Sequence, residues 1–269
     1  MSGPVVVGVD GSPASLKAVE FAAWEAGLRG VGLRLAHAFA WPSAPVPPGA
    51  PPWDPDGVGL TELVNGTLAE AEQRAHAVAP QVNVTSDVLV GEPATVLQSE
   101  SRIASLTVVD GRRTSRLDGL LHGSVAGRLT ARGCCPVLVV RGRQNPTGPV
   151  VLAYDASPAA RAAAEFALAE ASVRGADLVV LRTRHLWAAR PTSSADLADV
   201  RKEYPDVSVD IQRVTGWSGR TVVEASAGAQ LVVIGAPEWS RVVDVLPVAS
   251  RAVLRHGHCP VAVVPSKEV

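Results

Sequence analysis

The chain has 269 residues, of which 47% are hydrophobic and 19% are charged. This composition excludes a largely disordered protein, and the length corresponds to about two domains. Lys plus Arg number 25 and Asp plus Glu number 26, so the formal net charge is −1. Broad nonspecific nucleic-acid binding needs a strong basic excess and is therefore not expected.

The cysteine count and the N-terminal sequence bear on the compartment. Three cysteines are too few for a disulfide framework and fit a reducing cytoplasm. The start, MSGPVVVGVDGS, lacks the basic region of a signal peptide. The uncharged stretch Leu35–Trp53 contains six prolines, which excludes a membrane helix there. We expect a cytoplasmic protein with no membrane association.

Strands and helices are predicted to alternate along the first half. The expected strands are short apolar runs of the kind that helices cover on both faces: Val5–Val9, Leu33–Phe39, Val82–Val90, Leu106–Val109 and Val137–Val140. The expected helices are one that begins at Ser12-Pro13 and ends before Gly30, then Glu62–Val78, Pro93–Ile103 and Ser124–Ala131. Their alternation with the strands predicts a parallel sheet.

Two of these helices have a predicted apolar face. In the first helix its members are Leu16, Val19, Ala23 and Ala26. In the second they are Leu63, Leu68, Ala71, Ala75 and Val78.

The chain contains an internal repeat. VVVGVDGSPASLKAVEFAAWEAGLRG from Val5 matches VVLAYDASPAARAAAEFALAEASVRG from Val150, and CPVLVV from Cys135 matches CPVAVV from Cys259. We therefore predict two domains, residues 1–143 and 148–269, joined by the polar linker RGRQNPTG. The second is shorter, with a shortened second helix around Asp196–Tyr204.

Unusual residues follow two of the predicted strands. Asp10-Gly11-Ser12 follows the first strand, and the stretch from Asp110 to Ser124 follows the fourth. In open parallel sheets, ligands bind beyond the carboxyl ends of the strands. These two segments are therefore the candidate ligand-binding segments.

The ensemble of motifs resembles the universal stress protein family in its tandem form. The motifs are VVGVDGSPAS, LAHA, VGEPATVL, VVDGRRTSRLDGLLHGSVAGRLTARGCCPVLVV and their second-half partners. The resemblance implies an α/β fold of two tandem Rossmann-like domains, each a five-stranded parallel sheet with helices on both faces (adenine nucleotide α-hydrolase-like). It also implies pairing through the last strands, here Val137–Val140 with Val261–Val264. Many family members bind ATP, others have lost the site, and the family's role is stress adaptation.

The resemblance also implies a nucleotide site in the first domain. In nucleotide-binding members, an acidic residue after the first strand contacts the nucleoside, the end of the second strand frames the base, and G-x-x-G followed by Gly-Ser holds the phosphates. The matching residues are Asp10, Gly11, Ser12, Ala38, Gly123, Ser124 and Val125. A Gly-Ser that opens a helix suits phosphate because the first helical N–H groups are unpaired.

Two departures from the family pattern affect this site. Asp110 and Arg113 stand where the family has the two glycines of G-x-x-G. A carboxylate about 4 Å from a phosphate charge costs roughly 1 kcal/mol in water and about 4 kcal/mol at an effective dielectric of 20. Arg113 offsets part of this cost, and a bridging magnesium ion reverses its sign.

The second domain departs further. Asp155 and Gly235 persist, but Glu238 occupies the second glycine position. Pro247-Val248 aligns with Gly-Ser, which removes an amide donor and a hydroxyl. We therefore expect this domain to have lost the phosphate site.

Three functional hypotheses follow. The first is a stress-response protein whose first domain binds ATP, with magnesium, or a related adenine nucleotide and acts as a regulatory or signalling module. The second is a nucleotide-free interaction module, with both sites degenerate and Asp10 only capping the loop before the first helix. The third is a slow ATPase with Asp110 as the base. No catalytic or metal-binding residue is assigned, and association into a homodimer stays open.

Two interpretations of Cys259 are open, a metal site and a packing role. His256-Gly257-His258-Cys259 has the composition of a metal site, whereas Cys259 also occupies the place of Cys135 at the start of a last strand. Packing explains that correspondence without a metal.

Overall fold

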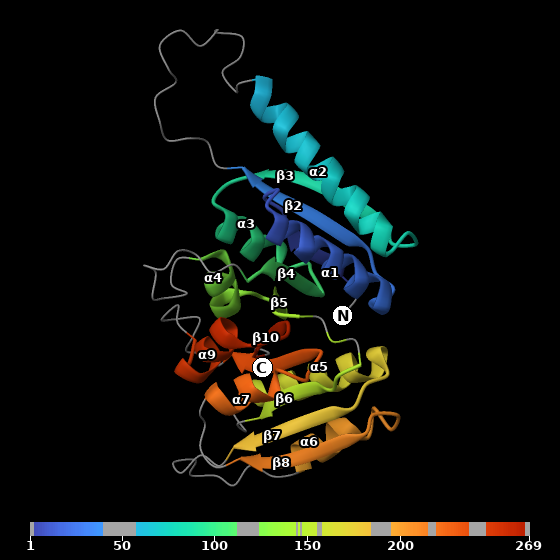
Figure 1. Cartoon of the computed structure of the whole chain (residues 1–269), viewed down its shortest axis with the longest axis vertical. Helices are drawn as coiled ribbons and strands as arrows, with labels where there is room; N and C mark the ends of the chain where they lie inside the picture. The colour runs from blue at the N-terminus through green and yellow to red at the C-terminus, as the bar shows by residue number, and fades with distance from the viewer. Residues whose placement is uncertain are drawn as a thin grey trace. The chain divides into compact units, whose positions relative to one another are not determined.

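The computed structural model describes residues 3–39, 58–111, 124–143, 145, 147–154, 158–183, 195–214, 219–236 and 246–266. The chain divides into two compact units, Met1–Asp110 and Gly111–Val269, which are described separately (Figure 1).

The first unit is a parallel sheet with helical connections. Its elements are β1 (Val5–Gly8), α1 (Pro13–Arg29), β2 (Leu33–Phe39), α2 (Val58–Val78), β3 (Val84–Val90), α3 (Pro93–Glu100) and β4 (Leu106–Asp110). Its strand order is β3-β2-β1-β4, and Val5 of β1 aligns with both Leu33 and Leu106. Val5, Val6 and Val7 are each 0% exposed. Since successive side chains of a strand point to opposite faces, both faces of this sheet are covered.

The ends of α1 match their sequence signals. Ser12 is the N-cap, and its Oγ accepts from the N–H of Ser15 at 3.2 Å, with Pro13 at the first helical position. Gly30 ends the helix with a φ of 63°, a conformation that glycine adopts at low cost. The predicted apolar face is buried at all four positions: Leu16, Val19, Ala23 and Ala26.

The predicted apolar face of α2 is partly wrong. Leu63 is 65% exposed and Val78 is 43% exposed, while Val64 is buried. Val64, Leu68, Ala71 and Ala75 follow the helical spacing of three or four residues, and Leu63 lies one residue outside it.

The second unit contains the remaining elements. They are α4 (Val125–Arg132), β5 (Val137–Val140), β6 (Val150–Tyr154), α5 (Pro158–Arg174), β7 (Leu178–Thr183), α6 (Ala195–Arg201), β8 (Val209–Val214), α7 (Gly219–Ala225), β9 (Leu231–Ala236), α9 (Val248–His256) and β10 (Val261–Pro265). Their strand order is β5-β10-β9-β6-β7-β8. The five strands of the second repeat, β8-β7-β6-β9-β10, pair in parallel. The predicted fold class of tandem Rossmann-like α/β repeats is confirmed.

The last strands of the two repeats pair with each other. β5 and β10 are antiparallel, with Val139 opposite Val261 and Val137 opposite Val263. The predicted edge-to-edge pairing is therefore confirmed. It also places β5 in the second compact unit, so the unit boundary falls after Asp110, before the repeat boundary predicted between residues 143 and 148.

Each repeat has an ion pair with a buried glutamate in its first helix, and the arginine is 17% exposed in the first repeat. Nε of Arg29 lies 3.4 Å from a carboxylate oxygen of Glu25, whose side chain is 0% exposed. In α5, Arg174 pairs with Glu170, and both side chains are 2% exposed. Both pairs join residues four apart, and they occupy equivalent positions of the repeats.

Candidate functional site

The carboxyl ends of β1, β2 and β4 form one edge of the first sheet. Val7 of β1 aligns with Val108 of β4, and Gly8 aligns with Ala36 of β2. Asp10 follows β1 closely, Ala38 is near the end of β2, and Asp110 is the last residue of β4. This edge thus carries three of the predicted site residues, in the place where parallel sheets bind ligands.

The turn after β1 has a defined conformation. Oδ1 of Asp10 accepts from the N–H of Ser12 at 3.0 Å, and the N–H of Asp10 donates to Oγ of Ser15 at 3.0 Å. Gly11 has a φ of 77°, and a Cβ there would lie 3.0 Å from Cγ2 of Thr67 on α2. The turn therefore needs glycine, and Asp10, whose Oδ1 accepts within the turn, is exposed.

Sequence reasoning missed one polar side chain at this edge. Nδ1 of His37 donates to the carbonyl oxygen of Val9 across 2.9 Å, and His37 is half-buried. This bond orients the imidazole ring and directs Nε2 away from that carbonyl. The signal was a histidine one residue before Ala38, in a strand that is otherwise apolar at its centre.

The predicted phosphate segment is described only in part. Arg113 and Gly123 lie outside the described residues. Ser124 is the N-cap of α4, its Oγ accepts from the N–H of Gly127 at 3.0 Å, and Val125 is the first helical residue. The first turn of α4 contains no acidic residue. The start of α4 is therefore capped by a hydroxyl group, and its first turn has no carboxylate that would repel an anion.

The second repeat lacks this cap. Asp155 and Glu238 lie outside the described residues. Pro247 is the N-cap of α9 with no side-chain capping bond, and Val248 begins the helix. Counted from the equivalent C-caps Gly133 and Gly257, Gly123 still corresponds to Pro247 and Ser124 to Val248. The cap shifts because α9 has nine residues where α4 has eight, so α9 begins one residue earlier.

Gly235 has a packing role. It lies within β9, and a Cβ there would be 3.0 Å from the carbonyl oxygen of Ala159 on α5. The glycine thus allows close helix–strand contact, so its retention alone does not indicate a phosphate site.

The cysteines divide into buried and exposed thiols. Cys135 and Cys259 are buried, and the Sγ of each donates to the carbonyl oxygen of the following proline. Burial raises the pKa of Cys259 to about 12, which opposes the thiolate form that binds metals. In the described part of the chain, no group of three or more His, Cys, Asp or Glu residues could hold a metal ion.

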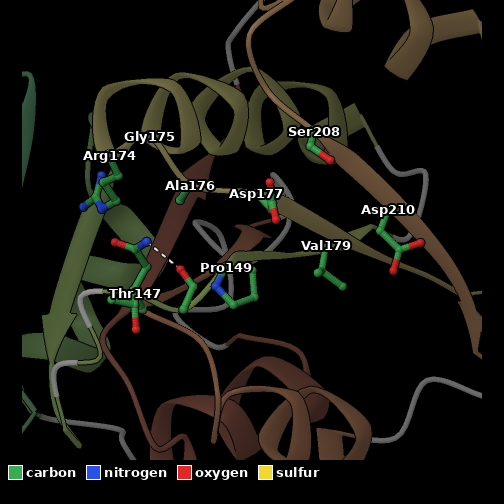
Figure 2. Close-up of a pocket in the computed structure, with 11 residues that line it drawn as sticks. Thr147, Pro149, Arg174, Gly175, Ala176, Asp177, Val179, Ser208 and Asp210 are labelled. Carbon is green, nitrogen blue, oxygen red and sulfur yellow. Dashed lines mark hydrogen bonds between the residues drawn. The ribbon is translucent and has the colours of Figure 1, made fainter.

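A cavity of about 390 Å³ lies at the opposite, amino-terminal edge of the second sheet (Figure 2). Its polar lining includes Arg174, Asp177, Ser208 and Asp210, near the starts of β7 and β8. None of the predicted site residues lines it. Among the described helices, none combines the length and apolar character needed to cross a bilayer.

Comparisons with known proteins identify the family. The sequence profile of the Universal stress protein family matches residues 1–141. The chain is 31% identical over 259 residues to universal stress protein Rv2623 of Mycobacterium tuberculosis, covering 86% of this chain and 85% of that protein. It is 32% identical over 303 residues to universal stress protein Rv1996 of the same species, covering 96% and 94%.

A solved structure supports the fold. A universal stress protein from Archaeoglobus fulgidus superposes with a TM-score of 0.78 at 19% identity, covering 100% of this chain and 98% of that one. At this identity the similarity concerns the fold alone. The family profile and the two near-full-length relatives show that this chain belongs to the universal stress protein family.

Proposed function

We propose that the first repeat binds an adenine nucleotide and that the protein acts as a regulatory or signalling module in the stress response. The observation that carries the proposal is the turn Asp10-Gly11-Ser12, which holds an exposed carboxylate at the ligand-binding edge of the first sheet. Its backbone is set by Gly11 and by the capping bonds of α1, so little ordering is needed on binding.

The family motif, and not the placement of the two units, assigns the phosphates to the start of α4. Its first N–H groups have no acidic neighbour in the first turn, and Ser124 already has the extended backbone of an N-cap. Gly123, Val125 and Arg113 complete this assignment by their positions in the family motif. A helix N-terminus with these properties stabilises a phosphate through N–H groups and the helix dipole.

Asp110 opposes this assignment unless a cation is bound. It ends β4 at the position of the first family glycine. Magnesium prefers carboxylate and phosphate oxygens, so we assign Asp110 the role of a magnesium ligand in the nucleotide complex. Nucleotide binding should then depend strongly on magnesium.

Calorimetric titration of the full-length protein with ATP, with and without magnesium, tests the proposal. We expect binding with magnesium, weaker binding after Asp10→Ala or Ser124→Ala, and unchanged binding after Asp210→Ala, which removes an exposed carboxylate in the second unit. Saturation at 100 times the dissociation constant should stabilise the protein by about 2.7 kcal/mol. The absence of any heat or thermal shift at millimolar ATP would contradict nucleotide binding.

Asp110→Gly separates the two roles of that carboxylate. If Asp110 only repels phosphate, the variant binds ATP more tightly in both conditions. If it holds magnesium, the variant gains affinity without magnesium and loses much of the magnesium dependence. Phosphate release no faster than in an Asp110→Ala variant would exclude the slow-ATPase hypothesis.

The second candidate is a nucleotide-free interaction module. It is favoured by Asp110 in place of glycine and by Pro247, which caps α9 without a side-chain bond. A protein that gives no nucleotide response under any of these conditions would have this function instead.

A further inference from the structure

Two stretches of the sequence contain basic but no acidic residues. No Asp or Glu occurs between Asp118 and Asp155, or between Asp244 and Glu268, although these stretches contain six arginines. Because the whole chain has slightly more acidic than basic residues, the rest of the protein is distinctly acidic. The charge is therefore segregated rather than mixed.

The second unit brings parts of the two stretches together. The antiparallel pairing of β5 with β10 places the carboxyl end of β5 beside the amino end of β10. The N–H of Arg143 donates to the carbonyl oxygen of His258 at 2.8 Å. A Cβ on Gly142 would lie only 2.0 Å from that same oxygen, so the two backbones are in close contact.

Arg141 fixes this arrangement at the end of α9. Its Nη2 donates to the carbonyl oxygen of Arg255 at 2.6 Å, and its Nη1 donates to that of Val253 at 3.3 Å. The guanidinium thereby satisfies carbonyl groups at the helix C-terminus and offsets their negative partial charge. We call Arg141, Arg143, Arg255, His256 and His258 the basic cluster.

Four side chains of the basic cluster are available to a partner. Arg143, Arg255, His256 and His258 are exposed. Within the described residues, these side chains form no salt bridge and no hydrogen bond. Structural needs of the second unit therefore do not account for them.

The other repeat provides an internal comparison. The shared motif CPV aligns Cys135 with Cys259, which places Cys134 at the position of His258 and Pro265 at the position of Arg141. Each repeat forms its last strand, β5 or β10, although the two repeats do not share these basic residues. The basic cluster is thus a property of one end of the β5–β10 pair and not a requirement of the fold.

We propose that the basic cluster docks an acidic peptide segment of a partner protein. The exposed guanidinium groups of Arg143 and Arg255 attract carboxylates, speed their association and select partners by charge, and His256 and His258 add hydrogen-bonding groups beside them. A long polyanion such as nucleic acid would extend beyond the basic cluster onto a chain that is otherwise acidic, which favours a short acidic segment. This proposal does not depend on nucleotide binding.

Fluorescence anisotropy with the full-length protein and a labelled octaglutamate peptide at low salt tests it. The test variant is Arg143→Glu/Arg255→Glu. The control is Arg201→Glu/Arg213→Glu, which makes the same charge change at exposed arginines on α6 and β8. Because all four side chains are exposed, both variants should fold, and circular dichroism checks this.

We expect the peptide to bind the parent protein and the control variant alike, and the test variant about tenfold or more weakly. Equal losses in both variants would mean that net charge alone attracts the peptide, and this would overturn the proposal. The absence of peptide binding at low salt would also overturn it. Tighter binding of a single-stranded oligonucleotide of equal charge, lost in the same test variant, would assign the basic cluster to nucleic acid instead.

Discussion

Replacing Arg174 by methionine should destabilise the protein by about 3–5 kcal/mol, the usual cost of leaving one charge of a buried pair without its partner. The Arg174 and Glu170 side chains are each 2% exposed, so solvent screens their interaction very little. Methionine keeps an unbranched apolar stem like that of arginine but lacks the charged guanidinium group. The loss of stability therefore measures mainly the effect of leaving the buried Glu170 carboxylate without its ion-pair partner, and to a smaller extent the loss of packing.

Two further variants separate charge from volume. Arg220→Met removes the arginine of the Arg220–Glu224 pair, whose side chains are 85% and 62% exposed, and it should leave stability almost unchanged. The double variant Glu170→Leu/Arg174→Met replaces the buried pair with apolar groups and should recover most of the loss. Such recovery would show that the pair is costly to break and nearly neutral to replace.

Urea unfolding followed by circular dichroism measures these differences, and hydrogen exchange of the α5 amides locates them in the second unit. Local measurement matters because a protein with two compact units need not unfold in one step. A loss for Arg174→Met below about 1 kcal/mol, or no recovery in the double variant, would refute the reasoning from burial.

Two other predictions follow from the second unit. Gly142→Ala should lower the free energy of unfolding by about 1–3 kcal/mol, because Gly142 has a φ of 63° and an added Cβ would meet the His258 carbonyl oxygen. The loss should exceed that of the control Gly175→Ala, since Gly175 has a φ of 60° but nothing within 4 Å of an added Cβ. Equal thermal shifts for the two variants would contradict the close contact at Gly142. At pH 8 a thiol-reactive disulfide should label the exposed Cys134 rapidly and the buried Cys259 only on unfolding, because burial raises the pKa of Cys259 to about 12 and leaves almost no thiolate. Mass spectrometry of the labelled peptides measures both rates. Rapid labelling of Cys259 in the folded protein would contradict the prediction.

Most of the fold could be predicted from local sequence signals. Ser12, Pro13 and Gly30 marked both ends of α1 because capping depends on residues within one turn. The pairing of β5 with β10 was implied by the resemblance to the universal stress protein family and not by a local signal. The outward position of Leu63 could not be predicted from the sequence, because Leu63 and Val64 are neighbouring apolar residues and only packing decides which of them faces the core.

The sequence could predict where in the fold the candidate site lies, but not the contacts that its residues make. The edge that carries Asp10 and Asp110 follows from the parallel direction of the strands, because each residue lies at or just after the carboxyl end of its strand. The bond from His37 to Val9 and the contacts of Arg141 with α9 join residues distant in sequence, so no local pattern announces them. The one-residue difference between α4 and α9 likewise required the observed helix caps.

The antiparallel β5–β10 pair has an evolutionary consequence. Two identical chains can form such a pair across a two-fold axis, but any mutation then appears on both sides of it. Here the partners are encoded in tandem, so each can change alone, as the exchange of serine for proline at the two helix caps illustrates. The tandem arrangement thus frees the two halves from exact symmetry, so that a residue can change in one half without the same change in the other.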